Sequence, residues 1–182
     1  MLMKTFKLPK LNKKIPTKQI IKDGAVFLIN IAIIIGVYIG SIFLNGIGEN
    51  GVGFGEYFLG EGLTDFLYLV LSLCLFMAVL IICLYFDDKK YFFEARNLEM
   101  IFLIIEINLI ASFLVGRYID LYLRPLILVS LLSVQFFGKR FAVYLNLMTT
   151  LMVFLMDAFT NSGIVGADLY ASLFVGFSTG IL

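Results

Sequence analysis

Six apolar runs, separated by short polar segments, occupy the chain from residue 24 onward. The first has 22 residues, enough for ~33 Å of helix against a hydrocarbon core of ~30 Å. This pattern predicts an all-α fold, a polytopic integral membrane bundle of about six transmembrane helices. The runs are 24–45, 66–86, 100–116, 121–137, 141–156 and 169–182.

The runs divide the chain into four regions. We expect a basic tail over 1–23, a first transmembrane helix over 24–45, a Gly-rich acidic loop over 46–65 and a five-helix bundle over 66–182. A cleaved signal peptide is the alternative for the first helix, but the run is long for one and lacks a clear cleavage site. The last run allows only ~21 Å of rise. We therefore expect a chain truncated inside its last helix, with a tilted or re-entrant helix as the alternative.

The basic residues are distributed unevenly among the connections. The tail, the 87–99 loop and the 138–140 turn hold seven, three and two Lys or Arg residues, whereas the three alternate connections hold zero, two and zero. Because basic residues are retained on the cytoplasmic side, the tail is predicted to lie inside. The protein is thus expected in the cytoplasmic (inner) membrane, with its amino terminus inside and the 46–65 loop outside.

Composition excludes most soluble functions. Of 182 residues, 61% are hydrophobic and 15% charged, and the mean hydropathy is +1.01, far from a soluble domain. The chain has no histidine, the commonest general base and zinc ligand. Cys74 and Cys83 are ~13.5 Å apart along one helix, too far for a disulfide.

We expect no catalytic residue, no metal and no cofactor. The expected partner is the lipid bilayer, not nucleic acid; self-association or other membrane subunits remain open.

One stretch of the 46–65 loop matches a dinucleotide-binding pattern. Gly46, Gly48 and Gly51 give GxGxxG, but they follow a membrane helix rather than a strand, and neighbouring carboxylates would repel phosphate. The better interpretation is a flexible external loop whose glycines prevent regular structure.

Small residues recur every four positions on two of the expected helices. Such a stripe lets a neighbouring backbone approach closely, within one chain or between subunits. The stripes are Ala32, Gly36 and Gly40 in the first helix, and Ser172, Gly176 and Gly180 in the last.

Polar residues inside the apolar runs form a candidate intramembrane layer: Asn30, Glu106, Asn108 and Asn146. Glu106, Asn30 and Asn146 each lie ~7–11 Å inside the cytoplasmic edge. Since Glu106 and Asn108 point ~200° apart on one helix, they need different partners. We expect Glu106 to face the bundle interior and to bond Asn30 or Asn146.

A second polar group is expected at the external end. Asp157 closes a helical stripe with Asn146 and Thr150, and it lies near Arg117 and Arg124 of the preceding external turn. An interfacial ion pair with interhelical hydrogen bonds is the favoured interpretation; a cation or proton path is the alternative.

From residue 66 onward the layout resembles the membrane region of bacterial seven-transmembrane HD-domain (7TM-HD) phosphodiesterases. The segments that carry it are LYFDDKKYFFEARNLEMIFLII, YLRPLILVSLLSVQFFGKRFAVYLNLMTTLMVFLMD and ASLFVGFSTGIL. In that family a proline starts one helix, a short basic turn leads to an alanine-containing helix, and a glycine-bearing helix follows. The matching residues here are Pro125, Gly138 to Arg140 with Ala142, and Gly176 with Gly180.

The resemblance implies a membrane anchor and signal-relay role. In the family, an extracellular domain follows the first membrane helix, and a cytoplasmic HD domain binds two metals and hydrolyses cyclic di-AMP. No family catalytic residue maps onto this chain, which is therefore expected not to be an enzyme. Two other classes stay open: a small-solute-binding subunit of a transporter, with Glu106 and Asn146 in its pocket, and a cell-envelope scaffold of the rod-shape-determining type.

Overall fold

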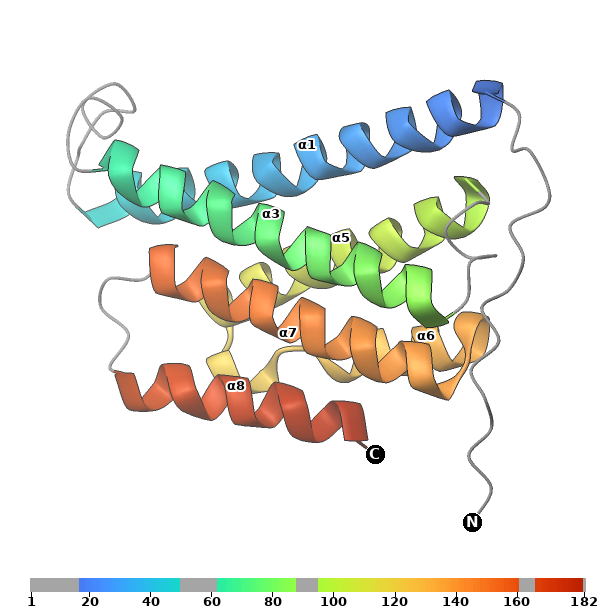
Figure 1. The fold of residues 1–182 in the computed structure, drawn as a ribbon. Helices are drawn as coiled ribbons and strands as arrows, with labels where there is room; N and C mark the ends of the chain where they lie inside the picture. Colours follow the sequence, from blue (N-terminus) through green and yellow to red (C-terminus); the bar gives the residue numbers. More distant parts are fainter. Residues whose placement is uncertain (1–16, 50–61, 88–94, 161–165, 182) are drawn as a thin grey trace, which may run out of the picture.

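The computed structural model describes residues 17–49, 62–87, 95–160 and 166–181, and in these ranges the chain is all-α, as predicted. Figure 1 shows its long helices lying side by side, and helices that follow one another along the chain run in opposite directions. The elements are α1 (Thr17–Glu49), α3 (Gly62–Asp87), α5 (Ala95–Tyr118), the 3₁₀ helix η1 (Leu121–Leu123), α6 (Ile127–Phe137), α7 (Lys139–Thr160) and α8 (Gly166–Ile181).

The expected loop between the first two helices is shorter than the sequence pattern indicated. α1 continues to Glu49 and α3 begins at Gly62, so Gly46 and Gly48 are helical. A glycine costs a helix only about 1 kcal/mol relative to alanine, which a long apolar helix tolerates. The expectation that these glycines prevent regular structure was wrong at both helix ends; 50–61, with Gly51, lies outside the described residues.

The fourth apolar run is broken rather than a single helix. Asp120 caps η1, accepting a hydrogen bond from the Tyr122 backbone N–H at 3.0 Å. Arg124 then has an extended backbone, with φ −59° and ψ 135°, the conformation that a following proline imposes. Pro125 thus precedes α6 instead of lying inside a helix, and α6 starts only at Ile127.

A single residue separates α6 from α7. Gly138 has a φ of +97°, a conformation that side-chain-bearing residues rarely adopt. Its N–H donates to the Val134 carbonyl at 3.3 Å, which ends α6. The two helices therefore form a tight antiparallel pair, and the predicted 138–140 turn is reduced to Gly138, because Lys139 and Arg140 belong to α7.

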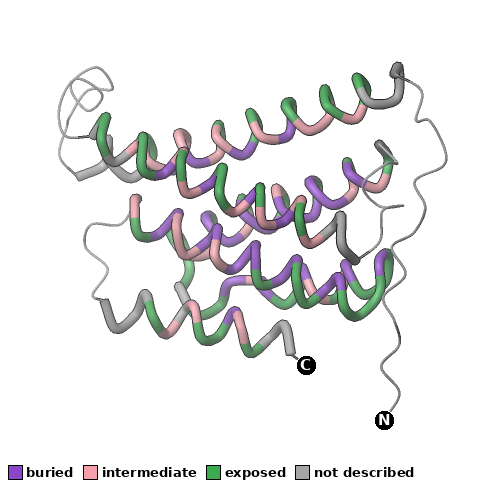
Figure 2. The backbone as a smooth tube through the Cα atoms, viewed as in Figure 1, coloured by how far each residue is buried: buried purple, intermediate pink, exposed green. Residues whose placement is uncertain are grey.

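α7 is the central helix of the bundle. It contacts α1, α3, α5, α6 and α8, and 67% of its span is buried, against 44% for α5 and 22% for α1 and for α3. Figure 2 shows this contrast as purple along α7 and much green along α1 and α3. The exposed surfaces carry large apolar side chains such as Leu28, Leu71 and Leu131.

Among the described residues, four helices are long and apolar enough to cross a membrane, which indicates a membrane-embedded protein whose apolar surface contacts lipid. α6 is apolar but has only 11 residues. The four spans are Ile21–Leu44, Phe66–Cys83, Arg96–Tyr118 and Lys139–Phe159.

Candidate functional site

The most deeply buried charges of the described chain form one ion pair. Arg124, between η1 and α6, meets Asp157 near the end of α7, and the two side chains are 3% and 2% exposed. The Arg124 Nη2 donates to Asp157 Oδ1 at 2.7 Å, and Nη1 donates to Oδ2. This two-pronged geometry is the strongest way to satisfy both groups away from water.

Arg117, the other expected member, lies elsewhere. Its guanidinium sits 5.6 Å from the centre of the Tyr118 ring, and the residue is exposed. The pair is also buried in the protein rather than placed at an exposed interface, because the break before Pro125 turns Arg124 towards α7.

Gly116 makes room for the Arg124 guanidinium. A Cβ at this position of α5 would lie 2.6 Å from Nε and 2.8 Å from Cζ of Arg124, so any side chain there would displace the arginine. Three elements, α5, η1 and α7, therefore meet at the pair. Sequence reasoning missed Gly116; the signal was a glycine in the last turn of an apolar helix, close in sequence to an arginine.

A second polar contact joins α7 to α8. The Asn146 Nδ2 donates to the Gly176 carbonyl at 2.8 Å. A Cβ on Gly176 would lie 2.8 Å from Thr150 Oγ1 and 3.0 Å from Leu126 Cδ1. The missing side chain of Gly176 thus allows α8 to pack directly on the Asn146 and Thr150 face of α7. Ser172 and Gly180 also belong to α8, but their surroundings lie outside the described set.

The four residues of the predicted layer are not bonded to one another. Asn30 donates to the Val26 carbonyl of its own helix at 2.7 Å, and Asn146 is directed to α8. Both polar side-chain atoms of Asn108 are buried without a hydrogen-bond partner among the described residues, as is Glu106 Oε1. The bond expected between Glu106 and Asn30 or Asn146 is therefore not formed in this structure, and Glu106 is half-buried rather than enclosed in the bundle interior as expected.

The small-residue stripe of α1 makes no close approach to a neighbouring helix in the described chain, although Gly40 is partly buried. Ala32 and Gly36 are exposed, and a Cβ on Gly36 or Gly40 would meet no atom within 4 Å.

A hydrogen bond from Tyr38, a residue that sequence reasoning missed, joins α1 to α7. The Tyr38 hydroxyl, fully buried, donates to the Met152 carbonyl of α7 at 2.6 Å. A tyrosine within an otherwise aliphatic stretch was the available signal.

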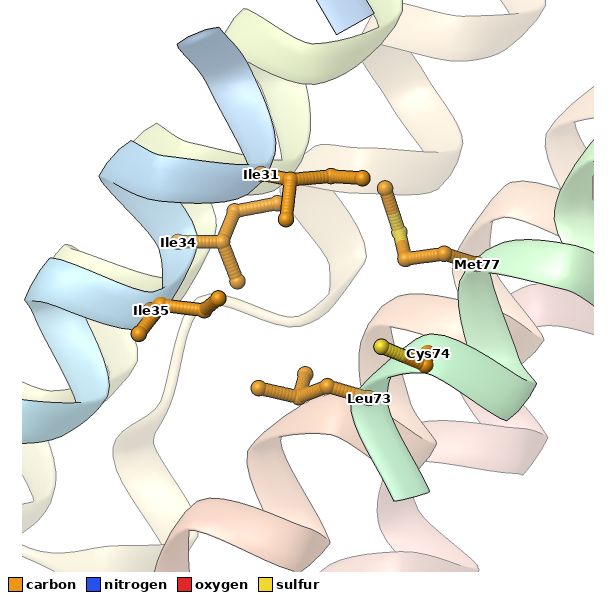
Figure 3. Close-up of a pocket in the computed structure, with 6 residues that line it drawn as sticks. All are labelled: Ile31, Ile34, Ile35, Leu73, Cys74 and Met77. Carbon is orange, nitrogen blue, oxygen red and sulfur yellow. The ribbon is translucent and has the colours of Figure 1, made fainter. Parts of the chain in front are cut away.

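A pocket between α1 and α3 is wholly apolar. Its cavity volume is only about 20 Å³, it is partly open to the surroundings, and its side chains project from the two helices towards each other (Figure 3). No polar side chain could orient a solute there. The lining residues are Ile31, Ile34, Ile35, Leu73, Cys74 and Met77.

Similarity to known proteins does not decide among the candidate roles. Protein-family models, curated proteins and solved structures yield no match to this chain.

Proposed function

We propose that this chain is a non-catalytic membrane anchor and signal-relay module of the kind found in 7TM-HD phosphodiesterases. The observation that supports this role best is the buried Arg124–Asp157 pair, which ties η1 and α7 together beside Gly116 of α5. Separating the two charges would leave each uncompensated in an apolar medium, which is strongly unfavourable. The elements that meet at the pair should move as one body.

α7 provides the route from that pair to the other end of the bundle. α7 has 22 residues, from Lys139 to Thr160, with Asp157 in its last turn. This gives ~33 Å of continuous helix. Because α7 packs against five other helices, a displacement at the ion pair would be carried to the Gly138 turn. A relay needs this kind of stiff element between two ends.

The proposal includes a topology of six crossings with the amino terminus inside. It is supported by the twelve basic residues of the tail and the two connections assigned to the cytoplasm, against two in the others. In a Cys74→Ser/Cys83→Ser background, we expect a cysteine at Lys139 to react with an impermeant maleimide only after the membrane is opened. A cysteine at Gly53, outside the described residues, should react in intact cells. The reverse pattern would contradict the orientation.

The relay role is tested on the protein in its native membrane. The tagged chain is purified, its reading frame beyond Leu182 is determined, and proteins that accompany it are identified by mass spectrometry. We expect an HD-domain hydrolase, continuous with the chain or bound to it. Its metal-dependent hydrolysis of cyclic di-AMP should change in Asp157→Asn when the variant and the wild type are compared at equal amounts of protein in the membrane.

Two results would refute this role in favour of another. Thermal stabilisation by one member of a vitamin panel would indicate a solute-binding transporter subunit. Co-purification with cell-wall synthesis proteins, without any hydrolase, would indicate an envelope scaffold.

A further inference from the structure

We propose that Glu106 is a proton-binding site on the outer side of the contact between α1 and α5, where its carboxyl group is held neutral and faces Asn30. The register of the two helices places Glu106 and Asn30 at the same level. The Phe27 and Phe102 rings meet edge to face, with centroids 5.6 Å apart, and α1 and α5 run in the same direction (Figure 1). Asn30 and Glu106 follow these rings by about 4.5 and 6 Å along the helix axes, so they lie at one level.

Both side chains also lie on the same side of the contact. Each residue turns the helix by about 100°. Asn30, three residues after Phe27, is therefore rotated by about −60° around α1 relative to Phe27. Glu106, four residues after Phe102, is rotated by about +40° around α5 relative to Phe102. In two parallel right-handed helices that face each other, these opposite rotations lead to the same side. It is the side away from α7, because Asn108 and Ser112 are turned the other way and are buried. Glu106 is half-buried there.

Among the side chains that the structure describes, none on the packed elements offers a positive charge to Glu106. α6 has no charged residue, and no charged side chain of the described residues acts on this carboxyl. The charged groups described on the other segments packed on α5 lie towards helix ends: Lys22, Asp23, Arg124, Lys139, Arg140 and Asp157. An ionised carboxylate at this depth, without a cation, is costly, whereas the neutral acid is not.

The hydrogen-bonding state of Asn30 is compatible with the neutral acid. One of its two amide N–H donors is used on the Val26 carbonyl of its own helix, and its side-chain oxygen is an acceptor. A carboxylate has only acceptors, whereas a protonated carboxyl also has one O–H donor. Proton uptake therefore removes the charge and supplies a donor for the Asn30 oxygen across the α1–α5 contact. Loss of the proton would put a charge on the lipid side and loosen that contact.

Infrared spectroscopy of the chain in phosphatidylcholine vesicles tests the protonation directly. Between pH 6 and 8 we expect the carbonyl stretch of a protonated carboxyl group, present in the wild type and lost in Glu106→Gln. Dicyclohexylcarbodiimide, an apolar reagent, should modify the same residue. The acid's proton goes to a carbodiimide nitrogen and its oxygen to the central carbon, and acyl transfer from oxygen to nitrogen then gives a stable acylurea. Exposed Glu99, on the same helix, should react only with a water-soluble carbodiimide.

Two variants test the proximity of Asn30. Asn30→Lys places an ammonium group beside Glu106 and should abolish both the infrared band and the modification at pH 7. Ala32→Lys, at nearly the same depth but about 200° around α1, should leave both unchanged. If the wild type shows no protonated-carboxyl band that depends on Glu106, or if the two lysine variants behave alike, the proposal is wrong.

Discussion

α7 and α1 are both long apolar helices, yet the bundle holds them by different means. The buried face of α7 carries Asn146, Thr150 and Asp157, and these contact α8 and the Arg124 segment. In α1 the small residues Ala32 and Gly36 are exposed, and among the described residues one interhelical hydrogen bond, from Tyr38, links it to α7. Within the spanning stretches, 67% of α7 and 22% of α1 is buried.

The comparison shows what selects the inner face of a helix in a membrane. Lipid is as apolar as the protein core, so burial of leucine or isoleucine gives little preference for the interior. Hydrogen bonds, ion pairs and close backbone approach do give a preference, because their alternatives in lipid are unsatisfied groups. α7 has many such residues on one face, whereas α1 has few.

The largest effect should come from breaking the ion pair at the end of α7. Asp157→Leu leaves the Arg124 guanidinium buried without its partner, which should cost about 3–5 kcal/mol of unfolding free energy. The double variant Arg124→Leu/Asp157→Leu removes both charges and should regain most of that loss. Thermal unfolding in detergent measures both, with exposed Arg140→Gln as the control. Equal instability of the single and double variants would show that the charge itself is not responsible.

The next effect distinguishes the two glycine stripes. Gly176→Ala adds a Cβ less than 3 Å from the Thr150 hydroxyl oxygen, and such overpacking should cost about 1–3 kcal/mol. Gly36→Ala, with no atom within 4 Å, should keep or slightly raise stability, since alanine favours helix. Thr150→Ser, which removes the crowding methyl group, should partly rescue Gly176→Ala. If Gly36→Ala were the more harmful change in the purified monomer, the assignment of the packed face would be reversed.

The helices themselves could be read from the sequence, because apolar length alone defines them. Their ends could not. Gly46 and Gly48 continue α1, since an apolar helix tolerates glycine, and Pro125 breaks a run that hydropathy shows as continuous, since it fixes the backbone of Arg124.

The candidate site was predictable only in part. Arg124 and Asp157 are charges that an apolar sequence makes conspicuous, but the choice of Arg124 over Arg117 depends on the direction imposed by the break before Pro125. The partners of Asn146 and Asn30 are backbone carbonyls, at Gly176 and Val26. Every residue has such a carbonyl, so the sequence contains no signal for these pairings.

The smallest expected effect concerns the link between the two helices compared above. Tyr38→Phe keeps the buried ring but removes the hydroxyl that donates to the Met152 carbonyl. A single neutral hydrogen bond contributes about 0.5–1.5 kcal/mol, so the variant should unfold at a slightly lower temperature. Tyr144→Phe, exposed on α7, is the matched control and should not differ from the wild type. Because the Tyr38 bond is the one hydrogen bond that joins α1 to α7 in the described residues, amide hydrogen exchange should rise in α1 and not in α7. Faster amide hydrogen exchange in α7 than in α1 would contradict this prediction. It would mean that the Tyr38 bond stabilises α7 rather than α1.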